Sequence, residues 1–496
     1  MMNRYEMTNS KDAPEFDFDL FAEDTKLEVQ EEELTDEEIV ALEKKNIEAQ
    51  SRIQAKLTAV RGDLIFDIDQ MRDGLLRDTV LTILPYSQAS AENILYTCMT
   101  IFGNIVGYRP YNGIGNSNLR ANLFTLVVGE TALAGKTQGL DLVMGLFTEI
   151  DPEYARKCYQ DGIVTGAALL QLMDDGGIGD IAQHDRRLLS WEDEWQKNLH
   201  RFRSKENSLS QDYQKLKDKG AASKKIQGDD KYKVTKAHIS MIGNITPKAL
   251  LAENGRLVQP LINEGFMNRM LHVSTLMRTG STDLPVLNWK SDEFQELIAR
   301  WRKAIANATD IGQITVSLNA QLLQNEWDNV ETEIALDSID SKENPNIRML
   351  NGRRGYLAKQ LQIILALLDG SNKILAKHIR VSKVLMEYHH KSIIEIYGNA
   401  WSSTSSLTNT ERIQEQFLNS PDGRLTKTQL HNSHTKNKHM TSEELTKSLE
   451  ELVDKKFIVF DPETRMRNEV SGGNKRTEAY ILLEELEAKE KEEDGI

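Results

Sequence analysis

A short apolar run that ends in a glycine-rich loop constrains this chain more than any other feature. Residues 123–128, Leu-Phe-Thr-Leu-Val-Val, lead directly into Gly129 and have the composition of a buried strand. The loop that follows, residues 129–137, reads Gly-Glu-Thr-Ala-Leu-Ala-Gly-Lys-Thr, and residues 140–150 are helical in pattern. This order of strand, loop and helix predicts a phosphate-binding loop (P-loop), in which backbone N–H groups and a lysine hold phosphates.

The loop assigns roles to five residues. Lys136 would neutralise the β- and γ-phosphates of ATP, and the hydroxyl of Thr137 would ligate Mg²⁺. Gly129, Thr131 and Gly135 would let the backbone wrap around the phosphates. The loop has one more residue between its two glycines than the ordinary motif, and a chance Gly-Lys-Thr turn is the alternative. The position between a strand and a helix favours the nucleotide site.

Three acids follow a second apolar run, Leu-Leu-Ser-Trp at residues 188–191. An ATPase of this kind needs one acid at a strand end to hold Mg²⁺ and another group to orient the attacking water. We assign Glu192 to the magnesium, and either Asp193 or Glu194 to the water. The alternative is an acidic helix N-terminus, which the helix dipole alone would favour.

Further polar candidates lie next to later segments. Asn244 ends a third apolar run and would touch the γ-phosphate or the water, unless it only forms a turn. Arg269 precedes a fourth run, where ring-forming ATPases place an arginine finger; a surface ion pair is the alternative. Arg353 and Arg354 begin an amphipathic helix from which one of them could reach the phosphates, and we include Arg354 among the catalytic candidates.

The apolar runs alternate with helical segments, which predicts an α/β fold with a parallel sheet covered by helices on both faces. Three helices followed by two strands near the C-terminus predict a winged helix. The expected parts are a largely disordered acidic tail (1–50), a helical domain (51–115), a P-loop ATPase core (116–285), a helical lid (286–400), the winged-helix domain (401–483) and a second acidic tail (484–496).

The net charge of -15 is carried by the two ends of the chain. Residues 1–50 hold 16 acids and 5 bases, and residues 481–496 hold 7 acids and 2 bases, so the body is almost neutral. A DNA partner is therefore compatible with the composition. A lysine-rich insert at residues 201–236 would contact DNA phosphates, as in the pore hairpin of ring helicases; a solvated charged loop is the alternative.

The predicted winged helix is also rich in basic residues, which suit contacts to a DNA backbone or groove. These residues are Lys427, Lys436, Lys438, Lys447, Arg465, Arg467, Lys475 and Arg476. Winged helices also dock proteins, so this role stays open.

No apolar run approaches the ~18 residues of a membrane helix, the first twenty residues lack a signal-peptide pattern, and there are two cysteines. We therefore expect a cytoplasmic protein without a membrane partner.

Several blocks of the sequence together resemble a family of P-loop proteins of unknown function. Phages, plasmids and integrated elements carry this family, often near primase-polymerases. The blocks are residues 102–104, 128–131, 187–189, 237–246, 265–269 and 366–371. Family members often have Arg-Lys-Gly-Thr-Ser where this chain has Gly-Lys-Thr-Gln-Gly at residues 135–139, so the lysine matches and its flanks do not.

The order of P-loop, acids, polar strand end, arginine, helical lid and winged helix is also similar to that of minichromosome-maintenance-type AAA+ helicases. The resemblance implies a ring, such as a hexamer, that hydrolyses ATP with Mg²⁺. Such a ring would unwind or translocate on single-stranded or forked DNA for a mobile element, with a primase-polymerase as a further partner. The alternative is an ATP-gated initiator, loader or defence sensor that binds DNA without unwinding it.

Overall fold

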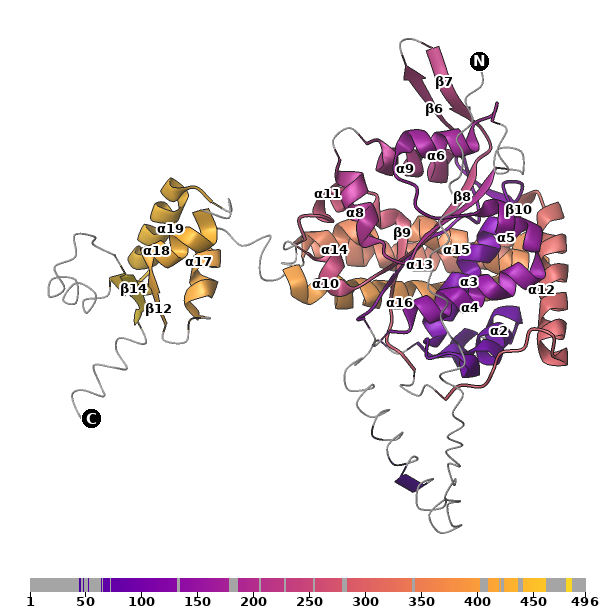
Figure 1. Cartoon of the computed structure of the whole chain (residues 1–496), viewed down its shortest axis with the longest axis horizontal. Helices are drawn as coiled ribbons and strands as arrows, with labels where there is room; N and C mark the ends of the chain where they lie inside the picture. Colours follow the sequence, from indigo (N-terminus) through magenta and orange to yellow (C-terminus); the bar gives the residue numbers. More distant parts are fainter. Residues whose placement is uncertain are drawn as a thin grey trace, which may run out of the picture. The chain divides into compact units, whose positions relative to one another are not determined.

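The computed structural model of the chain describes residues 64–460 and 479–483, together with four residues between 44 and 52 (Figure 1). Short gaps within these ranges lie at residues 65, 72, 132–133, 178–185, 205–206, 227–228, 253–254, 279–282, 341–343, 402–408, 419, 421–422 and 436–439. The predicted acidic tails fall almost entirely outside the described residues. Within the described part of the chain, no helix is both long enough and apolar enough to cross a membrane.

A five-stranded, all-parallel sheet forms the centre of the α/β fold, as the sequence predicts. Its strands lie in the order β4-β5-β8-β3-β9. They are β3 (Phe124–Val128), β4 (Tyr159–Gln160), β5 (Arg187–Glu192), β8 (His238–Ile245) and β9 (Met270–Ser274). The four apolar runs of the sequence each form one strand, and only the short edge strand β4 was not predicted. Strand β3, which carries the glycine-rich loop, lies between β8 and β9.

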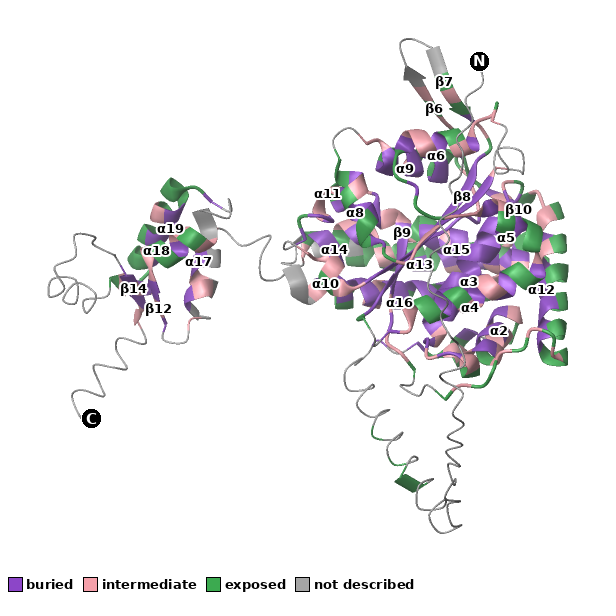
Figure 2. Cartoon of the chain, in the orientation of Figure 1, coloured by how far each residue is buried: buried purple, intermediate pink, exposed green. Residues whose placement is uncertain are grey.

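Alternate residues of the strands face two separate apolar cores, so helices cover both faces of the sheet (Figure 2). Phe124, Leu126 and Val128 of β3 belong to one core, whereas Ile242 of β8 and Leu271 of β9 belong to the other. The helices of the first core are α6 (Gly166–Met173), α8 (Gln196–Arg203), α9 (Leu209–Lys219), α10 (Pro247–Leu250), α11 (Gln259–Asn263) and α14 (Pro345–Leu350). Those of the second are α2 (Leu75–Ile83), α3 (Ala91–Ile105), α4 (Lys136–Ile150), α5 (Pro152–Cys158), α12 (Asp292–Asp310), α13 (Leu318–Asp340) and α15 (Arg354–Leu368), and α16 (Ala376–Trp401) contributes to both.

Helix α3 lies at the centre of the second core, with every residue from Glu92 to Ile105 buried. The Thr100 hydroxyl is 2.7 Å from that of Thr125 in β3, so a hydrogen bond joins the helix to the sheet. Helices α12, α15 and α16 share the same apolar cluster. The described helices of the first expected domain and of the expected lid therefore share their apolar cores with the strands of the sheet. Short 3₁₀ turns connect these helices: η2 (Ile68–Met71), η3 (Leu84–Tyr86), η4 (Met267–Arg269) and η5 (Asn351–Arg353).

Two smaller sheets lie within the same region of sequence. A four-stranded sheet in the order β11-β10-β1-β2 joins β1 (Tyr111–Ile114), β2 (Ser117–Leu119), β10 (Gln313–Val316) and β11 (Lys373–Ile374). The lysine-rich insert contains α9 and then an antiparallel hairpin of β6 (Ala222–Ile226) and β7 (Asp229–Val234), which projects from the body in Figure 1. The predicted hairpin is therefore present.

The C-terminal part has an apolar core of its own, built from residues such as Ile413, Phe417 and Leu449. Its elements are α17 (Asn409–Leu418), β12 (Arg424–Thr426), α18 (Lys427–Leu430), a π-helical turn η6 (His431–Thr435), α19 (Ser442–Asp454), β13 (Ile458–Phe460) and β14 (Ala479–Leu482). Helix α19 begins with a capping box, in which Thr441 and Glu444 exchange hydrogen bonds. The three helices and the last two strands follow the predicted order, and β12 adds a third antiparallel strand.

Candidate functional site

The glycine-rich loop leaves β3 at its carboxyl end and turns directly into α4. Gly135 has φ of 56°, in the left-handed region that favours glycine, and Lys136 is the first residue of the helix. No side chain would fit at Gly129 either, because a Cβ there would lie 2.5 Å from the carbonyl oxygen of Thr275. The first-turn N–H groups of α4 therefore point into the space beyond the sheet edge, which is the arrangement that binds phosphates.

A chain of hydrogen bonds joins this loop to two other strand ends. The Thr137 hydroxyl donates to both carboxylate oxygens of Asp193, at 2.9 and 3.1 Å. The Asn244 side-chain amide donates to the same carboxylate at 2.9 Å. Asp193 follows β5 and Asn244 lies near the end of β8, so residues from three strand ends meet at one edge. The carboxyl edge of a parallel sheet is where such folds bind ligands.

The Lys136 ammonium folds back over the loop and donates to the carbonyl oxygens of Gly129 and Glu130. Burial lowers the pKa of Lys136, while the negative charges of Asp193 and Glu130 oppose this shift. A half-buried ammonium held only by backbone oxygens is ready to exchange them for the more strongly charged oxygens of a phosphate.

The three acids after β5 have different surroundings. Glu192 is turned away from the loop, where its carboxylate accepts a 2.9 Å hydrogen bond from Arg201 and is 12% exposed. Glu194 is 71% exposed and forms an ion pair with Lys197 at 2.8 Å. Asp193, in contrast, contacts the hydroxyl that would ligate Mg²⁺. Of the three acids, Asp193 is therefore the one that contacts Thr137, whereas Glu192, which the sequence assigned to the magnesium, is paired with Arg201.

A cavity of about 630 Å³ opens between the loop and these strand ends. Its lining includes Thr131, Gly135, Lys136, Thr137, Asp193, Glu194 and Asn244. The other residues of the wall are Gln88, Glu130, Gln138, Gln196, Lys197, His200, Ile245, Thr246 and Ala249. The lining residues thus bring together most of the predicted site, but no arginine is among them.

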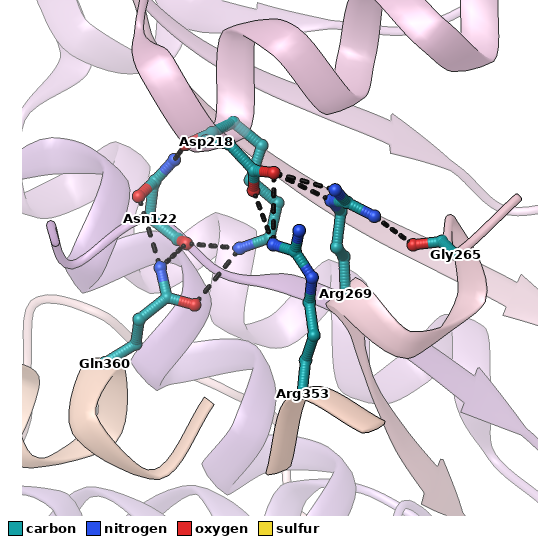
Figure 3. A network of polar contacts seen from close by, with 7 residues as sticks. Asn122, Asp218, Gly265, Arg269, Arg353 and Gln360 are labelled. Atoms are coloured by element: carbon teal, nitrogen blue, oxygen red, sulfur yellow. Dashed lines mark hydrogen bonds and ion pairs between the residues drawn. The ribbon is translucent and has the colours of Figure 1, made fainter. Parts of the chain in front are cut away.

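Arg269 lies at the opposite ends of the strands from the loop. It precedes Met270 of β9, which pairs with Phe124 at the start of β3. The loop begins after Val128, so the two edges are separated by five residues of strand, or roughly 17 Å at ~3.3 Å per residue. Arg269 pairs there with Asp218 at 2.8 Å (Figure 3). Within one chain, Arg269 therefore cannot reach a nucleotide on the P-loop.

Of the two adjacent arginines, Arg353 joins this second cluster and Arg354 does not. Arg353 donates to both oxygens of Asp218, at 3.1 and 3.0 Å. Arg354 turns to Glu331 of α13, with a 2.7 Å ion pair beside a different cavity. Arg354 therefore lies apart both from the P-loop and from Arg269, and Arg353 lies beside Arg269 and not at the P-loop.

Some residues around the P-loop carry no recognisable signal in the sequence. Gln138 accepts a 3.0 Å hydrogen bond from the backbone N–H of Gln88, and Asn93 of α3 donates to the carbonyl oxygens of Gly135 and Lys136. Burial, together with the charge of Asp193, raises the pKa of Asp141 in α4. These partners lie about forty to fifty residues apart in sequence, so only the fold brings them together.

The basic residues proposed to contact DNA are described only in part. On the hairpin, Lys231 and Lys233 are exposed, and Lys224 donates to the Ser208 hydroxyl at 3.3 Å. Six basic residues of the predicted winged helix lie outside the described residues, namely Lys436, Lys438, Arg465, Arg467, Lys475 and Arg476. Among the residues that the structure describes, no group of three or more His, Cys, Asp or Glu is arranged to hold a metal by itself.

In comparisons with known proteins, no family model matches the chain and no curated protein matches it significantly. The resemblance to the mobile-element P-loop family therefore rests on the sequence blocks themselves. Any functional conclusion depends on the geometry of the site.

Proposed function

We propose that this protein is an AAA+-like P-loop ATPase that hydrolyses ATP with Mg²⁺ and acts as a motor on DNA. The observation that carries the ATPase is the hydrogen-bonded group of Thr137, Asp193 and Asn244 beside Lys136 at the carboxyl edge of the sheet. Catalysis of phosphoryl transfer consists mainly of positioning and of stabilising charge, and these side chains supply both.

Each residue has a role that follows from its place. Lys136 and the first N–H groups of α4 bind the β- and γ-phosphate oxygens. Glu194 extends from the cavity wall with an exposed carboxylate and orients the attacking water. Asn244 fixes the Asp193 carboxylate through its amide N–H, and its own side-chain carbonyl oxygen is buried and has no hydrogen-bond partner among the residues that the structure describes. That oxygen can accept a hydrogen bond from the water.

The residues at the cavity also suit a magnesium ion. Mg²⁺ keeps several waters and is usually held by one or two protein oxygens plus the substrate phosphates, so a dedicated metal cluster is not required. Thr137 and Asp193 present a hydroxyl and a carboxylate within 3.1 Å of each other, next to the phosphate-binding helix end. When bound, the ion would neutralise negative charge on the phosphates.

The substitution Asp193→Asn tests this assignment. The amide keeps the shape of the side chain but loses its charge, so we expect turnover to fall about ten- to 150-fold, as a loss of ~1.5–3 kcal/mol implies. Nucleotide binding should change less. Phosphate release at saturating ATP and Mg²⁺ measures the first quantity, and titration with a fluorescent ATP analogue measures the second.

Glu192→Gln is the matched control, because it makes the same chemical change one residue away at the Arg201 ion pair. Its turnover should stay within a few-fold of wild type. If Glu192→Gln lost turnover and Asp193→Asn retained it, the magnesium would belong to Glu192, as first inferred from the sequence, and Asp193 would have no part in turnover.

DNA binding is supported by a separate feature, the projecting β6–β7 hairpin. Lysines lie along and beside it, at Lys219, Lys224, Lys231, Lys233 and Lys236. Contacts to DNA phosphates need basic side chains and no sequence code. The alternative function, an ATP-gated initiator, loader or defence sensor, uses the same two features without unwinding.

Stimulation by DNA separates the motor from the switch. For a motor, we expect single-stranded DNA to raise the rate of ATP hydrolysis, because translocation couples each turnover to a step along the strand. The effect should weaken with increasing salt, as DNA affinity does. A wild-type protein that binds single-stranded DNA and hydrolyses ATP at an unchanged rate would instead support the switch.

A further inference from the structure

The start of α3 and the residues just before it lie directly against the P-loop and the first turn of α4. A Cβ added at Gly135 would be 2.9 Å from the backbone of Ala89, and one at Gly139 would be 2.3 Å from the side-chain nitrogen of Asn93. Gly135 and Gly139 are four residues apart, so they lie on the same side of the helical turn. Gly139 has an ordinary helical backbone within α4, so the close approach of Asn93 is the feature that requires a glycine there.

Asn93 uses this contact to bind two backbone carbonyl groups. Its side chain is buried in α3. Its Nδ2 donates hydrogen bonds to the carbonyl oxygens of Gly135 and Lys136, both at 3.3 Å. Its Oδ1 accepts a 3.5 Å hydrogen bond from the Thr97 hydroxyl one turn later, which orients the amide. One side chain thus holds the two peptide groups at the junction of the loop and α4.

The two carbonyl groups fix the direction of two N–H groups. A peptide unit is planar and trans, so the carbonyl of one residue and the N–H of the next point in opposite directions. The carbonyl of Gly135 therefore sets the N–H of Lys136, and the carbonyl of Lys136 sets the N–H of Thr137. With both carbonyls turned towards α3, both N–H groups point away from α3. Lys136 and Thr137 line the P-loop cavity, and theirs are first-turn N–H groups of the kind that bind phosphates.

The start of α3 is itself held in place on two sides. The Ser90 hydroxyl is 2.6 Å from that of Thr275, and the Thr275 N–H donates to the backbone at the end of β3. The Gln88 N–H donates to the side chain of Gln138 in α4 at 3.0 Å. The side chain that contacts the P-loop therefore acts from a frame joined to both the sheet and α4. Accurate positioning of a binding site requires this kind of support.

We propose that Asn93 is a positioning residue for the nucleotide, which turns the N–H groups of Lys136 and Thr137 towards the phosphates before a nucleotide arrives. This inference rests on the proposed ATPase function and adds a residue of α3 to its site. Asn93 acts through the two N–H groups and not by touching the nucleotide. Its effect comes from preorganisation, because a loop already held in its binding conformation loses less conformational freedom when the ligand binds.

This role predicts a change in the affinity for ATP and not in the chemical step. The two N–H groups contact the phosphates before and during transfer, so loosening them weakens the ground state and the transition state alike. Asn93→Ala should therefore raise both KM and Kd for ATP about five- to tenfold, as expected when one or two hydrogen bonds are lost. The kcat should stay within about twofold of wild type. Phosphate release gives KM and kcat, and titration with a fluorescent ATP analogue gives Kd.

Asn104→Ala is the matched control, because Asn104 is a buried asparagine that makes the same kind of contact near the other end of α3. Its Nδ2 donates to the carbonyl oxygens of Leu188 and His238, at 3.0 and 3.2 Å. Both variants remove an amide that binds two backbone carbonyls, so both should lower the urea concentration at the midpoint of unfolding. Only Asn93→Ala should raise KM. Equal values of KM for the two variants would leave Asn93 with a structural role alone and overturn the inference.

Gly139→Ala reaches the same contact from the other side. Its Cβ would displace the Asn93 amide, so this variant should raise KM about as much as Asn93→Ala does, although alanine is the better helix former. In the double variant the displaced amide is no longer present. The KM of the double variant should therefore be no higher than that of Asn93→Ala alone. If the two increases in KM multiplied instead, the two residues would act independently and the inference would fail.

Failure of this inference can be told apart from failure of the proposed function. If wild type bound no ATP, the P-loop assignment itself would be wrong. If wild type and Asn93→Ala hydrolysed ATP with the same KM and kcat, only the positioning role would be wrong. A fall in kcat at unchanged KM for Asn93→Ala would place its effect on the chemical step, and would also overturn the inference.

Discussion

Lys136→Ala should lower the rate of ATP hydrolysis by about 10²–10³-fold or more, as expected when one charge-stabilising donor is removed from the transition state. Lys136 is the first residue of α4 and the only lysine in the glycine-rich loop. Among the described residues, its ammonium donates hydrogen bonds only to backbone oxygens, so its loss should remove the proposed phosphate contact without opening a hole in either apolar core. Phosphate release under excess ATP and Mg²⁺ gives the rate.

Lys248→Ala provides the comparison for this variant. Lys248 is exposed and neighbours Ala249, which lines the same cavity, but does not line the cavity itself. We expect both variants to melt close to wild type, and only Lys136→Ala to lose hydrolysis. Full hydrolysis by Lys136→Ala would remove the P-loop assignment.

Gly103→Ala should destabilise the fold by about 3 kcal/mol or more, at or above the upper end for overpacked cores. Gly103 lies in the buried helix α3, and a Cβ there would be 2.1 Å from the Ala121 carbonyl oxygen and 3.2 Å from Ile364. Alanine normally stabilises a helix relative to glycine by ~1 kcal/mol, so a loss of stability would show that the clash decides the sign. Urea unfolding followed by circular dichroism measures the change.

Gly113→Ala is the control for stability, because, apart from its two chain neighbours, no heavy atom of the described residues lies within 4 Å of a Cβ at that position. It should change the free energy of unfolding by no more than ~0.5 kcal/mol, as most surface substitutions do. Equal stability of the two variants would mean that the approach of α3 to Ala121 is looser than the structure shows.

The parts of the site that could be predicted from sequence are those fixed by local pattern. Four apolar runs became strands, and because parallel strands end at one edge, Asp193 and Asn244 meet Thr137 as their positions suggested. The partners of Glu192 and Asp193 could not be predicted from the pattern, because adjacent residues at a strand end point in different directions. Arg201, which holds Glu192 away, is nine residues later and its partner is set by the packing of α8.

Long-range pairings explain the other differences. Asp218 binds arginines 51 and 135 residues away, and nothing in the lysine-rich insert marks this one acid as their partner. Arg353 and Arg354 are neighbours in a helical turn and their side chains leave in different directions. The packing of α3 was beyond the sequence for a similar reason: an apolar helix has the same pattern whether it packs against other helices or against a sheet.

Helix α3 is hydrogen-bonded near both of its ends, to the P-loop and to the sheet. Near its start, Asn93 is tied to the backbone of Gly135 and Lys136 at the P-loop. Near its end, Asn104 is tied to the backbone of Leu188 and His238, at the amino ends of β5 and β8. A helix of 15 residues is about 22 Å long and stiff along its axis, so it couples the loop at the carboxyl ends of the strands to the amino ends of the strands. If the loop binds phosphate as proposed, a shift of the loop on losing that phosphate would be transmitted to the amino ends of β5 and β8 in the same chain.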